Sequence, residues 1–243
     1  MDQTNYAAWR DETIAKLLKK EHYGLYDLCD VVIILRGEGG CPWDREQDHH
    51  SVRKGLIEEC YEVVEAIDRE DSELLREELG DLLLQIVFHA DMEKDAGRFD
   101  IDDVAHDECV KMIHRHPHVF GTVEVENSDE VLRNWEVIKT EEKQRVTLAD
   151  RLNAIPPMLP ALMRAQKVGK KAEADADASV GELCSGMMAL LSTLPQSSSQ
   201  RQAEILGEVL FKTTSLCRSL GFEAEEVLTQ KTNEIIQNIA KQS

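Results

Sequence analysis

The sequence predicts an all-α protein, and three observations lead to that fold class. Apolar residues recur at steps of three and four, as in Leu56, Cys60, Val63 and Ile67, which is the spacing of one helix face. Residues suited to helix N-caps precede such runs, and glycine follows them. No set of segments alternates with the period of two that is typical of strands. We therefore expect a helical bundle.

The expected helices follow one another with short turns between them. An apolar run at 24–36 stops at Gly37, Gly39 and Gly40, where a turn is required. Further helices are expected over 51–68, from a cap at Asp71 or Ser72 to about 94, over 99–113 with Asp100 as cap, and over 128–145, with a loop at 114–121. The segment LLLQIVFHA is apolar on almost every side, which predicts the buried centre of a bundle or a subunit interface.

Composition excludes several classes of protein. The 243 residues hold 47 acidic and 28 basic side chains, for a net charge of -19. Nucleic-acid polymers are unsuited as partners, because their binding relies on clustered Lys and Arg. No apolar run approaches the roughly 20 residues of a membrane span, and the start of the chain does not resemble a signal peptide. We expect a cytoplasmic protein whose six cysteines are reduced thiols.

The excess of acid lies almost entirely in the front of the chain. Residues 1–147 hold 36 acidic and 18 basic side chains, which leaves 11 and 10 for residues 148–243. Most of these acids are expected to be solvated surface. The Pro-rich stretch at 155–160 separates the back part, where residues 204–226 resemble 77–104 in outline, and this similarity suggests an internal duplication with a decayed second copy.

Two predicted helices carry acids that solvation explains poorly. Glu58, Glu59 and Glu62 share one face, and Glu78 and Asp81 repeat the three-residue spacing on the next helix. Like charges at such spacing destabilise a helix, and we expect the penalty to be largest at Asp81, beside LLLQIVF. Surface acids paired with Lys or Arg are the plain alternative. Four carboxylates converging from two helices instead favour a site for Mg²⁺ or Mn²⁺.

A phosphorylated substrate would also need cations from the protein. Lys111 and Arg115 lie four apart near the end of a helix, and Lys139 follows Trp135 by four residues. Lys111 and Arg115 also suit charge pairing at the C-terminal end of a helix. Trp135 suits either stacking on a base or packing in the core. His114, His116 and His118 alternate in a loop, which is not the usual spacing of a zinc site, and loop packing is favoured for them.

Several motifs in order resemble those of the MazG-type nucleoside triphosphate pyrophosphohydrolases. They are GCPWD, LIEECYEVVEAID, REELGDLLLQIVFHA, GRFDIDDV, K-x-x-x-RHPHVFG and NWEVIK, within residues 25–145. The resemblance implies an all-α NTP pyrophosphatase fold whose helices associate as a homodimer. It also implies Mg²⁺-dependent hydrolysis of NTP or dNTP to the monophosphate and pyrophosphate, and a role in clearing non-canonical nucleotides.

The resemblance assigns roles to the residues already singled out. The metal ligands would be Glu59, Glu62, Glu78 and Asp81, with Glu58 as a further catalytic group that orients or deprotonates water or binds metal. The substrate-binding positions would be Lys111, Arg115, Trp135 and Lys139. Where the family tends to have Q-T-H-x-S-L this chain has QDHHSV, so the role of that segment in substrate choice is not carried over.

The back part departs further from the family pattern. We expect a catalytic domain at 1–147 and a second, degenerate MazG-like domain at 148–243, which keeps only Glu208 of the expected acids and serves packing, dimer contacts or regulation. The rival hypothesis is a non-catalytic, metal-stabilised dimeric module that binds nucleotides or regulates. A dUTP- or dCTP-specific pyrophosphatase is the lesser alternative within the same fold.

Overall fold

The computed structural model describes residues 3–142 and 147–242, and within them helices are the only regular secondary structure. The all-α prediction is confirmed. Two compact units divide the chain, Met1–Val125 and Glu126–Ser243. This boundary falls before the fourth predicted helix, whereas the sequence placed it after residue 147. No helix among the described residues is both long and apolar enough to cross a membrane.

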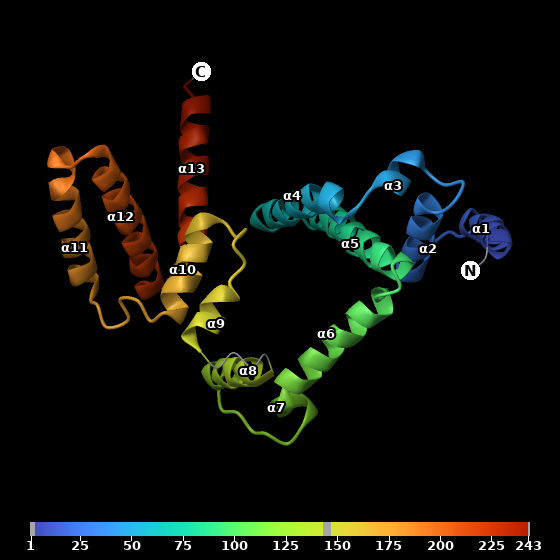
Figure 1. Cartoon of the computed structure of the whole chain (residues 1–243), viewed down its shortest axis with the longest axis horizontal. Helices are drawn as coiled ribbons and strands as arrows, with labels where there is room; N and C mark the ends of the chain where they lie inside the picture. The colour runs from blue at the N-terminus through green and yellow to red at the C-terminus, as the bar shows by residue number, and fades with distance from the viewer. Residues whose placement is uncertain (1–2, 143–146, 243) are drawn as a thin grey trace. The chain divides into compact units, whose positions relative to one another are not determined.

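The first unit holds seven helices in its described part. They are α1 (Gln3–Leu17), α2 (Leu25–Arg36), α3 (Pro42–Glu46), α4 (His49–Asp68), α5 (Ser72–Asp95), α6 (Ile101–Arg115) and α7 (Pro117–Phe120). Figure 1 shows α4 and α5 side by side as a hairpin, with α2 and α6 meeting the far end of α5. The sequence did not predict α1, and it assigned the residues of α3 to a turn and those of α7 to a loop. Prolines begin both short helices, at the position where a missing N–H costs nothing.

Aspartates fix the beginning of both helices of the hairpin. The Asp48 carboxylate accepts hydrogen bonds from the backbone N–H groups of His50 and Ser51, so α4 begins two residues earlier than predicted. Asp71 caps α5 in the same way, as expected. At the other end, Gly97 has a φ of 69°, a left-handed conformation that glycine adopts freely, and α5 stops just before it.

The core of the first unit lies at the C-terminal half of α5. Val32 of α2 packs with Val87, Phe88 and Met92, all of them buried. The segment LLLQIVFHA was expected to be the buried centre of a bundle or a subunit interface. Within the single chain only its second half is buried, and the interface alternative stays a prediction. Leu83 is 36% exposed and Ile86 39%. The reason is that the core around Val32 of α2 reaches α5 only from about Leu84 onward.

The second unit is also helical in its described part. It holds α8 (Ser128–Glu142), α9 (Leu148–Asn153), α10 (Ala161–Lys171), α11 (Val180–Thr193), the 3₁₀ turn η1 (Leu194–Gln196), α12 (Ser199–Ser219) and α13 (Ala224–Ala240). The predicted end of the fourth helix at residue 145 lies outside the described residues. In this unit α11 packs along α12, while α10 lies against α12 and α13.

Candidate active site

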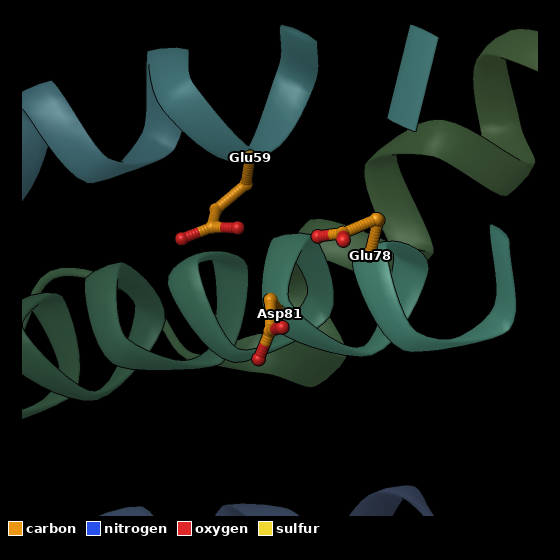
Figure 2. A group of neighbouring side chains, drawn as sticks. All are labelled: Glu59, Glu78 and Asp81. Carbon is orange, nitrogen blue, oxygen red and sulfur yellow. The ribbon is translucent and has the colours of Figure 1, made fainter. Parts of the chain in front are cut away.

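Three carboxylates meet between the two helices of the hairpin. Glu59 of α4 and Glu78 and Asp81 of α5 each offer an oxygen atom, and these oxygens lie within 4.8 Å of one another. Figure 2 shows Glu59 reaching from α4 toward α5, where Glu78 and Asp81 lie three residues apart. The antiparallel pairing of α4 and α5 is what brings residues 59 and 81 to the same level. We call these three residues the carboxylate cluster.

The electrostatics of the cluster disfavour its full ionisation. Partial burial raises the pKa of Glu59, and a hydrogen bond with Glu62 and the charges of Glu62, Asp81 and Glu78 raise it further. Burial likewise raises the pKa of Glu78, followed by the charge of Glu62 and other nearby acids. The structure corrects one expectation: Asp81 is exposed, while Glu59 and Glu78 are half-buried, because the apolar core begins further along α5.

No lysine or arginine in the described part of the chain forms an ion pair with a member of the cluster. The plain alternative of surface acids paired with cations does hold for Glu58. Its carboxylate lies 2.8 Å from the ammonium of Lys54, and its side chain is 56% exposed. Glu62 is exposed and lies beside Glu59, outside the group of three. The hairpin thus holds concentrated negative charge that protein groups leave uncompensated, which suits a divalent cation.

Two of the four residues expected to bind substrate belong to the first unit, and these two do not lie at the cluster. Lys111 forms an ion pair with Glu108 on α6, and Arg115 is buried at the end of that helix. Figure 1 shows α6 leaving the far end of α5, so its last turn does not lie on the α4–α5 hairpin. Trp135 and Lys139 are half-buried on α8, which belongs to the second unit.

A histidine network in the same hairpin escaped the sequence analysis. The Nδ1 atoms of His49 and His89 lie 2.7 Å apart, and their rings are stacked. His49 Nε2 lies 2.6 Å from a Glu93 carboxylate oxygen that also accepts a hydrogen bond from Arg98. This network ties the start of α4 to the end of α5. Its signal in the sequence is that His49 continues the series Val52, Leu56, Glu59 at steps of three and four.

The histidines at 114, 116 and 118 do not join a metal-binding group within the described residues. His116 and His118 have tilted rings 5.6 Å apart, and His116 Nδ1 lies 2.6 Å from the carbonyl oxygen of Met112. Local packing holds for His116, but the loop predicted for all three is wrong in part, because His114 lies in α6 and His118 in α7.

Comparisons with known proteins place the chain in a family. Residues 47–120 match the model of the MazG nucleotide pyrophosphohydrolase domain. The chain is 43% identical over 205 residues to the nucleoside triphosphate pyrophosphohydrolase of Escherichia coli strain K12, covering 81% of this chain and 78% of that protein. It is 36% identical over 218 residues to the nucleoside triphosphate pyrophosphohydrolase/pyrophosphatase MazG of Thermotoga maritima, covering 88% and 84%. A Mycobacterium tuberculosis nucleoside triphosphate pyrophosphohydrolase is 41% identical over 151 residues, covering 61% and 45%.

The matched domain and the relatives place the chain in a class of hydrolases that act on nucleotide pyrophosphate bonds. The chain belongs to the MazG family of that class. The resemblance noted in the sequence is thereby confirmed. The matched span 47–120 contains the whole α4–α5 hairpin and the cluster, together with α6 and α7.

Proposed function

We propose that this chain is a Mg²⁺-dependent nucleoside triphosphate pyrophosphohydrolase that converts NTP or dNTP and water to the monophosphate and pyrophosphate. The observation that carries the proposal is the carboxylate cluster, in which one oxygen from each of the three residues lies within 4.8 Å of the other two. The names of the relatives support the reaction. A nucleotide substrate agrees with a cytoplasmic place of action.

The cluster fits a hard divalent cation. Its donors are carboxylate oxygens, which Mg²⁺ and Mn²⁺ prefer. Burial first, and neighbouring negative charge second, raise the pKa values of Glu59 and Glu78, and a cation would stabilise their charged forms. Glu59, Glu78 and Asp81 would hold the ion, with Glu62 beside them as a fourth ligand. A divalent cation supplies neutralisation of phosphate charge and activation of water in such sites.

The remaining roles belong to side chains of the chain itself. Glu58 would orient or deprotonate the attacking water once it leaves Lys54, and an exposed pair of this kind is worth only a few tenths of a kcal/mol. Lys111, Arg115 and Lys139 would contact phosphate oxygens as negative charge moves toward the leaving pyrophosphate. Trp135 would stack on the base. Support for these four substrate residues comes from the family motifs, and Lys111 would first have to release Glu108.

An uncovered apolar face of the hairpin supports a homodimer. On α4 it comprises Ile57, Tyr61 and Val64, and on α5 Leu79, Leu83 and Ile86, all of them exposed. Both sets are spaced by four and then three residues, which is one stripe of a helix. A second copy of the hairpin would bury both stripes in a four-helix bundle. Light scattering after size-exclusion chromatography is expected to give twice the mass of 27.5 kDa.

The second unit is proposed to be a degenerate, non-catalytic repeat. Its helices α10, α11 and α12 contact one another as α2, α4 and α5 do, since α11 packs along α12 and α10 lies against α12. Where α4 carries its acids, α11 has the run SGMMA at 185–189. Glu208 remains on α12, paired with Arg201 at 3.4 Å. Packing, dimer contacts or regulation would be its role.

Pyrophosphate release by purified protein tests the proposal. Glu59→Gln and Asp81→Asn are expected to lower turnover at least 100-fold with Mg²⁺ and a panel of NTPs and dNTPs, because each removes a metal ligand. Glu208→Gln is the matched control and is expected to retain wild-type turnover. Near wild-type rates in both cluster variants would overturn the assignment. A wild-type protein that binds nucleotides without hydrolysing them would instead favour the rival hypothesis of a non-catalytic module. Activity confined to dUTP or dCTP would favour the dUTP- or dCTP-specific pyrophosphatase.

A further inference from the structure

A glycine occurs in α4 where the backbone does not require one. Gly55 lies inside the helix, where glycine is a poor helix former, and it is not among the glycines with positive φ. A Cβ at this position would lie 3.0 Å from Nε2 of Gln85 and 3.7 Å from its Oε1. The missing side chain therefore leaves room for the Gln85 amide to lie against α4.

This contact is adjacent to the carboxylate cluster. Gly55 precedes Glu59 by four residues on α4, and Gln85 follows Asp81 by four residues on α5. Because the two helices are antiparallel, both displacements run in the same direction along the hairpin. Each is about one helical turn, or roughly 6 Å. The Gln85 amide thus lies about one helical turn along the hairpin from the cluster.

The Gln85 amide makes no hydrogen bond to any residue that the structure describes, although its side chain is half-buried. Gln166 of the second unit shows the contrasting case. Its amide donates to the Phe222 carbonyl and accepts from the Ala224 N–H, so its polar atoms are engaged within the fold. An amide offers two N–H donors and one acceptor oxygen. Those of Gln85 are not among the fully buried atoms without a partner, so they remain accessible to a ligand.

The chemistry of an amide identifies the part of the ligand that it would contact. Phosphate oxygens favour the cation and the basic side chains, whereas a neutral amide matches the adjacent donors and acceptors on the edge of a nucleobase. We propose that Gln85, lying over Gly55, is a specificity-determining residue that hydrogen-bonds the base of a nucleotide whose phosphates bind at the cluster. The inference rests on the proposed function.

Substitutions at Gln85 test the inference through nucleotide preference. We would measure kcat and KM for ATP, GTP, CTP and UTP with Mg²⁺. A carboxylate only accepts hydrogen bonds, so Gln85→Glu is expected to shift the ratio of kcat/KM about tenfold toward ATP, CTP and GTP, whose bases carry an amino donor, and away from UTP, whose base has none. Gln85→Leu is expected to bring the four values closer together, mainly by raising KM for the preferred nucleotide about tenfold.

Gly55 offers an independent variant with a matched control. Gly55→Leu is expected to displace the amide and reproduce the levelling seen with Gln85→Leu. Gly207, on α12, has open space where a Cβ would stand, so Gly207→Leu is expected to keep the wild-type ratios. A change in ratios is a readout that a merely structural role would not produce.

The outcomes separate the role of Gln85 from the proposed pyrophosphohydrolase activity. If the ratios of kcat/KM among the four nucleotides stay within twofold of wild type in both Gln85 variants, the inference is overturned and the proposed function stays in place. A wild-type protein that hydrolyses no nucleotide would overturn both. Should thermal melting show that Gln85→Leu does not fold, Gln85→Glu and Gln85→Asn provide the same comparison.

Discussion

Replacing Glu59 by glutamine is expected to stabilise the metal-free protein while removing its response to metal. In the carboxylate cluster, oxygens of Glu59 and Asp81 lie within 4.8 Å of each other. Two unit charges at 4.8 Å repel by about 0.9 kcal/mol in a water-like dielectric, and partial burial strengthens the repulsion. Repulsion from Glu78 acts in the same direction. Glu59→Gln at pH 8 and low salt should therefore raise the free energy of unfolding by about 1 kcal/mol.

Added Mg²⁺ should reverse the order of stability. A ligand at 100 times its Kd stabilises the folded state by about 2.7 kcal/mol, and the wild type should gain on this scale while Glu59→Gln gains little. Thermal melts with chelator and with Mg²⁺, at one protein concentration, would show the crossing, since 1 kcal/mol shifts Tm by about 2–4 °C at this chain length. At 1 M salt the difference between the metal-free proteins should shrink, because the Debye length falls to about 3 Å.

Glu58→Gln is the matched control, since it removes the same charge from the next residue of α4. Glu58 has a cation partner in Lys54, so its loss is expected to leave stability unchanged or slightly lower. Equal stabilisation by both variants would attribute the effect to net charge and refute the role of the cluster. The role of the cluster would also be refuted if Glu59→Gln were less stable than the wild type in chelator, or if Mg²⁺ raised the stability of the two proteins equally.

Three further predictions concern the ion pairs and the histidine network of the first unit. Arg36→Met leaves the carboxyl of Asp91 buried without its cation and should cost about 3 kcal/mol in urea denaturation, and a loss below 1 kcal/mol would contradict this. Hydrogen bonding from Arg98 lowers the pKa of Glu93 from 4.5 to about 2, so Glu93 stabilises the fold above pH 4.5 and loses that contribution as the pH falls through about 2. Arg98→Gln should therefore narrow the difference in stability between pH 6 and pH 3, and an unchanged difference would count against the pairing. Burial lowers the pKa of His89, so the fold keeps it neutral and loses stability as the pH drops below 6.5, a decline that His89→Gln should flatten in denaturation curves from pH 7 to 5.

Local signals predicted much of the α4–α5 hairpin. Asp71 was expected as a cap and is one, and Gly97 was expected to end α5 and does so. The short helices α3 and α7 were not predicted, because each holds too few residues to display a periodic pattern. Composition alone could not say which part of LLLQIVFHA is buried within the chain and which part is left for a subunit interface, because it does not show how far a neighbouring helix extends along α5.

The acids of the site could be selected from spacing, since residues three or four apart share a helix face. Spacing could not say which of five carboxylates would meet. Glu59, Glu78 and Asp81 converge, whereas Glu58 pairs with Lys54 on the outer side of the same helix. The contact between Gly55 and Gln85 could not be predicted either, because it depends on the alignment of the two helices along each other.

The sequence by itself determined the helical class, the hairpin and the set of acidic residues, because caps and apolar periodicity act over a few residues along the chain. Only the tertiary structure decided the membership of the carboxylate cluster, the His49–His89 contact and the position of Gln85 beside Gly55. These features join residues 19 to 40 positions apart. Their proximity follows from how the antiparallel helices α4 and α5 are aligned. That alignment is set by the packing of α4 against α5 and by the α2–α5 core, rather than by any local pattern.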